Sequence, residues 1–475
     1  MNNNRNNAKV LLLNPHISGE ARYGKYKDVG SYLPPYGLLC IAGVLEQHGH
    51  IVKVIDADSR QGLAFDGLKQ AIVDLEPGVI GITAYSIGRT QVIETAGFIK
   101  SFSPALLVVG GPHVTTFPED LIKYDVFDAA VLGEGEYSVL DIIEYRLGRK
   151  KLCNIEGIIY KENGEKTKNQ NRANIEDLDS LPFPAFHLLD NLHDYMPMQL
   201  LYKRTPVLTL ISGRGCPYSC IFCNSIWGKQ VRLNSPDYIM RLIKKMINDH
   251  GVREIMFYED TFAIKKKRIH ELCDMIIKEN LNISWTCSAN VTTLDKALLE
   301  KMKEAGCWLL STGIESGSDE VLKFIKKPVR VEQVKQVCRW ADEAGIKIRG
   351  FFMLGHPVDT KETIRQTIDF AKSLPLFTIN FCILQLLPGS EVRSIAHEYG
   401  EVNYDLNLGS GHPGDTLSFV PKGLTKEYLK KMQRRGYTEF FVRPRQIWRL
   451  LSAIDSWEDI RKYFRMVFAF LKLYT

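Results

Sequence analysis

The chain has 475 residues, of which 45% are hydrophobic and 24% charged, and its formal net charge is +6. This length is more than one hydrophobic core supports and predicts two or three domains, while the composition excludes general disorder. The first residues, MNNNRNNAK, lack the apolar part of a signal peptide, and no uncharged apolar run is long enough to span a membrane. We therefore expect a cytoplasmic protein.

Short apolar runs alternate with helical patterns through residues 8–150. Strands that are apolar throughout and alternate with helices are typical of a doubly wound, Rossmann-like parallel sheet, so an α/β domain is predicted here. Ligands of such sheets bind beyond the carboxyl ends of the strands, where this sequence is rich in glycine. The expected strands are 9–14, 51–56, 79–84, 106–110 and 128–132.

The next segment, residues 151–200, is expected to be a linker. Its stretch KENGEKTKNQNRANIEDLDSLPFP is polar and then interrupted by proline. Such a composition is typical of a connection or a small excursion from the fold.

A second alternation of strands and helices occupies residues 201–395. Six βα units predict a partial (β/α)6 TIM-like barrel, in which functional residues lie on loops at the carboxyl ends of the strands. A helical C-terminal extension, residues 396–475, is expected to follow. The expected barrel strands are 207–212, 254–258, 283–287, 308–313, 346–353 and 378–386.

The loop after the first barrel strand contains three cysteines, Cys216, Cys220 and Cys223, with the spacing C-x3-C-x2-C. Three thiolates at this spacing can bind three irons of a [4Fe–4S] cluster and leave the fourth iron open to a substrate or cofactor. A zinc site would normally need a fourth ligand in paired spacing, and a disulfide framework is not expected without a secretory signal. We therefore interpret this loop as an iron–sulfur site.

The cysteine loop, CPYSCIFC, resembles the signature of the radical S-adenosylmethionine (SAM) enzymes. This resemblance implies that SAM binds the open iron and yields a 5′-deoxyadenosyl radical after one-electron reduction. An external electron donor such as flavodoxin or ferredoxin is then also implied. The resemblance extends to residues at the ends of the other barrel strands, which it assigns to SAM. These candidates are Phe222, Glu259, Asp260, Ser288, Asn290, Glu315 and Ser316.

The resemblance gives a place to each group of candidates, and Glu315 and Ser316 fall in the run GIESGS at 313–318, which resembles a motif of the family. Phe222 matches an aromatic residue beside the adenine, and Glu259 and Asp260 lie where relatives receive the SAM ammonium group. Ser288 and Asn290 match contacts to ribose or carboxylate, although the arginine that many relatives carry near this position is absent. Taken singly, a carboxylate at a strand end is as often a helix cap or surface group. His356 and Tyr258 are candidate catalytic residues, and a capping or packing role for each stays open.

The N-terminal region resembles the cobalamin-binding domain that one radical SAM class carries. The resemblance rests on LPPYGLL at 33–39, on GGPH at 110–113 and on LGEGE at 132–136. It implies cobalamin as a cofactor, with Gly110, Gly111, Gly133 and Glu134 among the binding residues. The D-x-H-x-x-G motif of cobalamin mutases is absent, which implies that loops 15–20, 83–89 and 110–117 hold the lower face of the cobalt. The alternative is a vestigial Rossmann-like module without a cofactor.

Residues 421–475 carry a net charge of +8, so the rest of the chain sums to −2. Aromatic and apolar residues recur among these basic residues at helical spacing, a pattern typical of a membrane-surface or partner-binding helix. Packing against the barrel is the equally weighted alternative. A peripheral membrane contact through 440–475 therefore stays open. Nucleic-acid binding is not expected, because the basic residues are confined to one segment and no RNA-binding domain is visible.

Together these patterns predict a cobalamin-dependent radical SAM enzyme that modifies an unactivated carbon. The family resemblance favours a methyltransferase that C-methylates a small-molecule or lipid-like substrate. A radical SAM cyclase or rearrangement enzyme acting on a lipid or tetrapyrrole is the alternative within enzymes. A cobalamin or redox-sensing protein is the alternative outside them, and a methylthiolating RNA enzyme would need a further cysteine triad that the sequence lacks.

Overall fold

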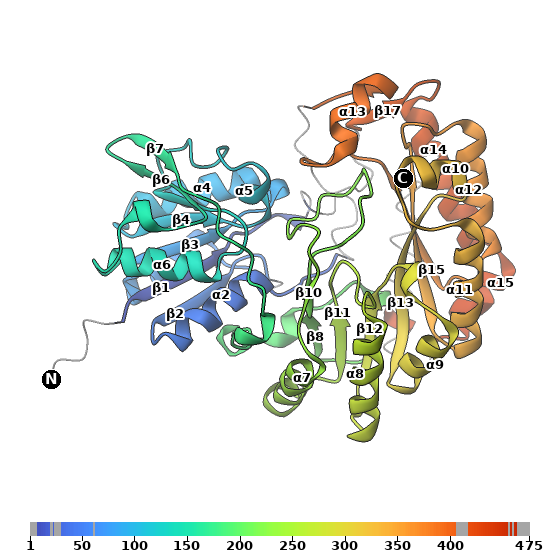
Figure 1. Ribbon diagram of the computed structural model, residues 1–475, viewed down its shortest axis with the longest axis horizontal. Coiled ribbons are helices and arrows are strands. Elements are labelled where there is room, and N and C mark those ends of the chain that lie inside the picture. Colours follow the sequence, from blue (N-terminus) through green and yellow to red (C-terminus); the bar gives the residue numbers. More distant parts are fainter. Residues whose placement is uncertain are drawn as a thin grey trace. The chain divides into compact units, whose positions relative to one another are not determined.

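The computed structural model describes residues 7–19, 22, 30–59, 62–404, 417–454, 457 and 460–462. The chain divides into two compact units, one built mainly from residues up to Met196 and one mainly from residues after it (Figure 1). Among the described residues, no helix is long and apolar enough to cross a membrane.

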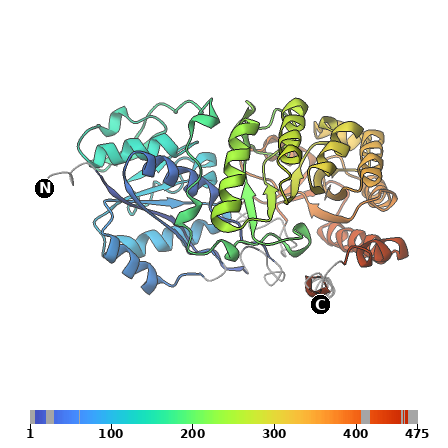
Figure 2. The same ribbon diagram turned by 90° about the horizontal axis from the view of Figure 1, so that it is seen from below.

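A seven-stranded sheet in the order β2-β1-β3-β4-β5-β6-β7 forms the centre of the first unit. Strands β1 to β5 are parallel, and helices cover both faces of the sheet (Figure 2). Strand β1 lies between β2 and β3, so β2 is added on one side of β1 and β3 on the other. The strand order therefore changes direction between β1 and β3, and ligands of doubly wound folds bind beside such a point. The strands are β1 (Lys9–Asn14), β2 (Ile51–Asp56), β3 (Val79–Thr83), β4 (Leu106–Gly110), β5 (Ala129–Val131), β6 (Ile158–Glu162) and β7 (Glu165–Lys168).

The core of this unit lies between the sheet and helices α3 and α4. Leu68 and Ile72 of α3 and Val92 and Ile99 of α4 pack with the apolar side chains of the strands, all of them buried. The prediction of a doubly wound parallel sheet is confirmed. The helices are α2 (Tyr36–Gln47), α3 (Phe65–Leu75), α4 (Arg89–Lys100), α5 (Pro112–Thr116) and α6 (Glu136–Arg146).

The expected linker is not all connection, because residues 158–168 form a hairpin that extends the sheet. Strands β6 and β7 pair antiparallel, with Glu162 opposite Glu165. Asn163 and Gly164 both have positive φ angles, 52° and 82°, as a two-residue hairpin turn requires. The Asn-Gly pair was thus a hairpin signal that the polar composition of this stretch concealed.

Six parallel strands in the order β15-β14-β13-β12-β11-β8 form the sheet of the second unit. The sheet does not close, so the partial (β/α)6 barrel is confirmed, with β8 and β15 at its edges. The strands are β8 (Val207–Leu210), β11 (Glu254–Phe257), β12 (Ser284–Ser288), β13 (Cys307–Glu315), β14 (Lys347–Leu354) and β15 (Thr378–Ile383). The helices between them are α7 (Pro236–His250), α8 (Lys266–Lys278), α9 (Lys296–Glu304), α10 (Asp319–Phe324), α11 (Val331–Ala344) and α12 (Lys361–Ser373).

Further helices and strands lie outside the six βα units of the barrel. Two small antiparallel pairs and three further helices follow or flank the barrel strands (Figure 1). They are β9 (Gly213–Arg214), β10 (Arg232–Leu233), α13 (Glu391–Tyr399), β16 (Gly400–Val402), β17 (Phe419–Pro421), α14 (Lys426–Phe441) and α15 (Pro444–Leu451).

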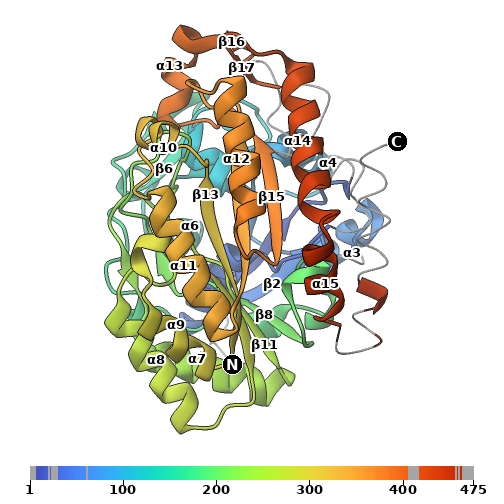
Figure 3. The ribbon, with the colours of Figure 1, turned by 90° about the vertical axis from the view of Figure 1, so that its right-hand side faces the viewer.

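Helix α14 packs against the edge strand β15, next to α12 (Figure 3). Gln433 donates a hydrogen bond to the Phe381 carbonyl oxygen at 2.7 Å, and the Phe381 N–H donates to the Tyr437 hydroxyl at 3.0 Å. Side chains of α14 therefore satisfy backbone groups at the free edge of β15. For residues 426–441, this supports the packing interpretation of the C-terminal extension.

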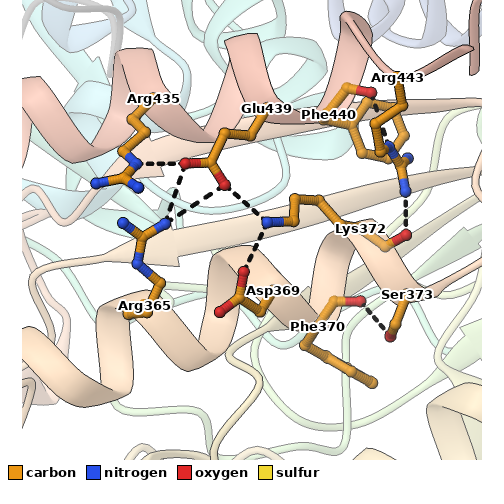
Figure 4. Close-up of polar contacts among 9 residues, drawn as sticks. All are labelled: Arg365, Asp369, Phe370, Lys372, Ser373, Arg435, Glu439, Phe440 and Arg443. Atoms are coloured by element: carbon orange, nitrogen blue, oxygen red, sulfur yellow. Dashed lines mark hydrogen bonds and ion pairs between the residues drawn. The ribbon is translucent and has the colours of Figure 1, made fainter.

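A charged cluster fixes α14 to α12 (Figure 4). Glu439 accepts hydrogen bonds from Lys372 at 2.7 Å and from Arg365 at 3.1 Å, and also from Arg435. Although burial alone would raise the pKa of Glu439, these three cations hold it at about 2. The carboxylate is therefore ionised at neutral pH and bridges the two helices.

Candidate active site

The cysteine loop begins at the carboxyl end of β8, where barrel enzymes place their functional residues. The Cys216 N–H donates to the Gly228 carbonyl oxygen at 3.1 Å, and the Ile221 N–H donates to the Ile325 carbonyl oxygen at 3.1 Å. Gly215 has a φ of 93°, and a Cβ there would collide with the backbone of Gln230. Backbone contacts thus set the path of the loop.

Cys216, Cys220 and Cys223 are free thiols, and Cys220 and Cys223 both interact electrostatically with Cys216. Burial raises the pKa of all three, that of Cys223 to about 11. No three His, Cys, Asp or Glu side chains among the described residues surround one point as a single metal ion requires. Cys216, Cys220 and Cys223 form an all-sulfur donor set, which fits an iron–sulfur cluster because each thiolate of a cluster binds a different iron.

A buried lysine, Lys327, lies against this loop. Its Nζ is 3.0 Å from Glu315 Oε1 and 6.0 Å from the centre of the Phe222 ring. Burial alone would lower the pKa of Lys327, but Glu315, Cys220 and Cys223 outweigh it and the pKa is raised. The site therefore contains a permanent positive charge beside the cysteines.

Glu315 occupies an unusual backbone position at the end of β13. Its φ is 65°, and the pairing of β13 with β14 shifts register between Gly313 and Glu315. A residue other than glycine with positive φ is uncommon and marks local strain, which the Lys327 ion pair helps to offset. Glu315, a predicted SAM contact, is thus positioned here by a partner within the protein.

Glu259 binds the backbone that leads into the cysteine loop. Its carboxylate accepts from the Ser212 N–H at 2.5 Å and from the Ser212 hydroxyl at 2.9 Å. Arg268 donates to the Ser212 carbonyl oxygen at 2.9 Å. Burial raises the pKa of Glu259 and Arg268 opposes that rise. The observed contacts therefore make Glu259 a support of the loop.

Asp260, the next residue, is exposed, and its charge acts on Cys216 and Cys223. It accepts a hydrogen bond from the Ser225 hydroxyl at 3.2 Å, and its charge raises the pKa of Cys223 further. Although the residue is exposed as a whole, partial desolvation of its carboxyl group raises the pKa of Asp260. Between these two neighbouring acids, Asp260 has the more open carboxylate for a ligand ammonium group. Tyr258 is half exposed at the same strand end.

Asn290 and Ser288 lie at the end of β12. The Asn290 side chain accepts from the Thr292 N–H at 3.0 Å and so caps a short 3-10 helix at Val291–Thr293. The Tyr218 hydroxyl, from the cysteine loop, lies 3.0 Å from the Thr292 hydroxyl. Ser288 is partly exposed, and its carbonyl oxygen accepts from the Phe262 N–H at 2.8 Å. Asn290 has a structural partner, whereas the Ser288 hydroxyl is the more open of the two.

Ser316 is almost fully buried at the end of β13. Its hydroxyl lies 3.1 Å from the Thr367 hydroxyl and accepts from the Ser318 N–H at 3.1 Å. These contacts tie β13 to α12 and hold the GIESGS segment in place.

His356 is fully buried at the end of β14, with its ring 5.9 Å from that of Phe222. Neither ring nitrogen has a hydrogen-bond partner among the described residues. Burial first, and then Lys327, lowers the pKa of His356 to about 3, so the imidazole is neutral. A buried polar group without a partner is costly and marks a place where a ligand or water is needed.

The glycine-rich loops of the first unit follow β4 and β5. Gly111 has a φ of 97°, and a Cβ there would lie 2.7 Å from the Thr83 hydroxyl, so only glycine fits. Gly110 ends β4, and Gly133, with a φ of 70°, donates from its N–H to the Thr115 hydroxyl at 3.0 Å. Glu134 accepts from the Ile175 N–H at 2.7 Å. A Cβ at Gly133 would meet nothing within 4 Å, which leaves room for a flat ligand.

Lys327, Arg268 and Ser212 were not among the expected site residues. Lys327 stands in the charged pair Lys326-Lys327, which reads as solvent-exposed helix-end sequence. Its partner Glu315 is 12 residues away, and Glu259 is 47 residues from Ser212. Contacts over such separations leave no periodic signal. The one available clue was the apolar strand around Glu315, since an ionised group there needs a partner.

Two family descriptions match the chain. Residues 210–371 match the radical SAM superfamily, and residues 27–143 match the B12 binding domain. An uncharacterised methyltransferase of Pyrococcus horikoshii is 32% identical over 92% of this chain and 93% of its own length. The cytidylyl-2-hydroxyethylphosphonate methyltransferase of Streptomyces wedmorensis is 25% identical over 84% of each chain. An anaerobic magnesium-protoporphyrin IX monomethyl ester cyclase of Rubrivivax gelatinosus is 27% identical over 77% of this chain and 65% of its own.

The fold is shared with solved structures. The cobalamin-dependent SAM radical enzyme OxsB superposes with a TM-score of 0.77 at 17% identity, over 98% of this chain and 72% of that one. A partial barrel with a cysteine loop after its first strand, joined to a doubly wound sheet, defines the class of radical SAM proteins with a B12-binding domain. The chain belongs to the radical SAM enzymes that carry a B12-binding domain and, within them, is related to a methyltransferase over nearly its whole length. The family identified from the sequence is confirmed.

Proposed function

We propose that the protein C-methylates an unactivated carbon of a small-molecule or lipid-like substrate, using a [4Fe–4S] cluster, SAM and cobalamin. The observation that carries this proposal is the set of three free thiols at the carboxyl end of β8 in a chain that also has a B12-binding domain. When bound, the cluster and SAM supply a 5′-deoxyadenosyl radical, and cobalamin supplies the methyl group.

The residues around the loop suit the charges of SAM. Cys216, Cys220 and Cys223 would hold the cluster, and Asp260 offers an exposed carboxylate to the ammonium group. Lys327 offers a positive charge to the carboxylate of SAM. This charge would replace that of the arginine which many relatives carry near Asn290. We propose Lys327 in that role on the strength of its burial beside the cysteines.

Phe222 and His356 contribute two neighbouring uncharged rings to the same site. Their rings are in near contact, and a neutral imidazole with two unmet nitrogens can donate to one polar edge and accept from another. We propose that Phe222 packs against the adenine and that His356 contacts a ligand's polar edge. Glu259, Asn290 and Ser316 then act by positioning backbone, because their polar atoms bind protein groups.

Anaerobic reconstitution with iron, sulfide and hydroxocobalamin tests the proposal. After desalting, we expect about four irons and one corrin per chain, and SAM with reductant should yield both 5′-deoxyadenosine and S-adenosylhomocysteine. Deoxyadenosine with no S-adenosylhomocysteine, across a screen of candidate substrates, would favour the cyclase or rearrangement alternative. Iron without corrin would overturn the cobalamin part. The triple variant C216A/C220A/C223A should lose iron, whereas C153A, at an exposed cysteine of the first unit, should keep it.

We propose a flavodoxin or ferredoxin as the electron donor, because the reductive step needs one electron at a time. Replacing the chemical reductant with either protein and its reductase should sustain 5′-deoxyadenosine formation. If neither protein does so while dithionite does, the donor belongs to another class.

We also propose a peripheral membrane contact through α15. Ile447, Trp448 and Leu451 are 45%, 72% and 57% exposed on one face of this helix, and Arg445 lies beside them. An apolar face flanked by basic residues favours the surface of an anionic bilayer. Within the predicted segment 440–475, residues 455–456, 458–459 and 463–475 lie outside the described residues. Flotation with vesicles containing anionic lipid should carry the protein upward, and W448S should reduce that fraction; equal flotation of both would contradict the contact.

A further inference from the structure

A chain of hydrogen bonds joins the loops that follow β3 and β4 in the first unit. Ser86 Oγ lies 3.0 Å from His113 Nδ1, and His113 Nε2 lies 3.0 Å from Asp120 Oδ2. Lys123 donates to the other oxygen of Asp120 at 2.8 Å, and Arg89 also binds this carboxylate. His113, in the middle of the chain, is 3% exposed, whereas Ser86 and Asp120 at its two ends are partly exposed.

The charges around the chain fix the direction of each hydrogen bond. Hydrogen bonds from Arg89 above all hold the pKa of Asp120 well below its usual range, so Asp120 is ionised and can only accept. His113 must therefore carry its proton on Nε2. Burial lowers the pKa of His113, so the ring is neutral and has no second proton. Its Nδ1 is then an acceptor, and the Ser86 hydroxyl donates to it.

Because the Ser86 hydroxyl donates to His113, Ser86 can only accept a hydrogen bond from a ligand. Its hydrogen is committed to His113, so only the oxygen lone pairs remain, and Ser86 is an acceptor. Hydrogen bonds in series polarise one another, which makes the terminal oxygen a better acceptor than an isolated serine.

Ser86 also lies where the fold places ligands. It begins a 3-10 helix, Ser86–Gly88, just after β3, at the side of the sheet where β1 and β3 meet. Side-chain bonds are not needed to join the two loops, because their backbones already meet. The Ala84 N–H donates to the Gly110 carbonyl oxygen at 2.8 Å, and the His113 N–H donates to the Ala84 carbonyl oxygen at 3.0 Å. The relay of side-chain hydrogen bonds from Ser86 through His113 to Asp120 therefore does not serve to join the loops. It fixes which atoms of these side chains donate and which accept.

We propose that Ser86 is a positioning residue that accepts a hydrogen bond from the corrin ring of cobalamin, and that His113 and Asp120 keep it in the accepting state. The amide side chains of the corrin ring are N–H donors of the required kind. This inference rests on the proposed function, because it takes cobalamin as the ligand of the first unit.

Binding of hydroxocobalamin and of cobinamide, which keeps the corrin ring but lacks the nucleotide tail, tests this assignment by equilibrium dialysis. The S86A variant of the full chain should bind both corrinoids about three- to tenfold more weakly, the range for one lost hydrogen bond. S86T keeps a hydroxyl and should bind within about twofold of the wild type. S101A is the control, because Ser101 follows the last residue of α4, is exposed, and its hydroxyl donates to the Phe98 carbonyl oxygen. D120N should weaken binding with Ser86 still present, since an amide can donate to Nε2 and so reverse the relay.

Thermal midpoints of all four variants separate binding from stability, and S86A should melt below S101A, because it leaves Nδ1 of the buried His113 without a donor. If S86A binds both corrinoids as tightly as the wild type, the inference is overturned while the proposed function stands. If S86A weakens hydroxocobalamin alone, Ser86 contacts the nucleotide tail and the corrin assignment is wrong. If the wild type binds neither corrinoid, the cobalamin part of the proposed function fails, and the role of Ser86 with it.

Discussion

Lys327 and Glu315 form an ion pair 3.0 Å long in which the side chains are only 11% and 9% exposed. The backbone makes room for it, because a Cβ on Gly313 would lie 2.7 Å from the Lys327 Nζ. Removing one partner of a buried pair leaves an uncompensated charge, whereas an exposed pair contributes little. The neighbouring lysine offers a direct comparison, since Lys326 pairs with Glu391 at the surface.

We expect K327M to lower the free energy of unfolding by about 3–5 kcal/mol, because Glu315 is left buried and unpaired. K326M should cost at most about 1 kcal/mol. Denaturant unfolding of the apoprotein measures both. The double variant K327M/E315Q should recover part of the loss, and equal stability of the two lysine variants would contradict a buried pair.

Glu259 gives a second prediction, which separates a supporting role from a ligand contact. E259Q places an amide N–H₂ against the Ser212 donors, so we expect a loss of about 2 kcal/mol and lower iron content after reconstitution. E279Q, which alters a surface pair with Lys244, should change neither. If E259Q keeps its stability and iron but loses affinity for SAM, Glu259 binds the ligand as the family resemblance implied.

The pH dependence of stability should report on Asp359. This carboxylate accepts from the Gly355 and His356 N–H groups, both at 2.9 Å, yet burial outweighs these bonds and raises its pKa to about 6. The folded state therefore binds more protons than the unfolded state between pH 3.8 and about 6. The contribution of Asp359 to the free energy of unfolding is fully present below this pH range. It is lost as the pH rises through the range, and the loss amounts to up to about 3 kcal/mol.

The difference in unfolding free energy between wild type and D359N isolates this group. We expect the wild type to lose stability relative to D359N as the pH rises from 4 to 7. A difference that stays constant over this range would show that Asp359 titrates normally in the folded protein.

Gly436 gives a fourth prediction, about the contact of α14 with β15. A Cβ at this position would lie 2.8 Å from the buried Phe381 ring, so G436A should cost about 1–3 kcal/mol by overpacking. Gly97 of α4 is the control, because a Cβ there meets nothing within 4 Å. G97A should be neutral or stabilising by up to about 1 kcal/mol, since it restricts the unfolded chain. Thermal unfolding of both variants measures the difference, and a stable G436A would contradict the close packing.

The apolar strand runs and their alternation with helices were enough to predict both sheets and the position of the cysteine loop. Those features depend on local periodicity, which a single sequence displays. The β6–β7 hairpin depended on two residues, Asn163 and Gly164, inside a polar stretch, and composition outweighed them. Short turn signals are easily lost in this way.

The sequence was enough to predict the types of residue that form the candidate site, but not which protein groups these residues contact. The three cysteines and the acids at the strand ends were found from the sequence. Whether an acid faces a ligand or the protein depends on contacts such as Glu259 with Ser212, which chain separation hides. The same applies to Lys327, which follows the charged and exposed Lys326 in the sequence but contacts Glu315 and Phe222 in space.

The hydrogen bonds from Gln433 and Tyr437 to the edge of β15 have a further consequence. An open barrel offers bare strand edges to any extended chain nearby, and one of the two edges here is occupied by the protein's own helix. Helix α14 thus covers an edge of the barrel sheet. A shortened chain ending before α14 would keep every candidate cofactor ligand yet present β15 as a template for other copies, so a minimal catalytic fragment should retain α14.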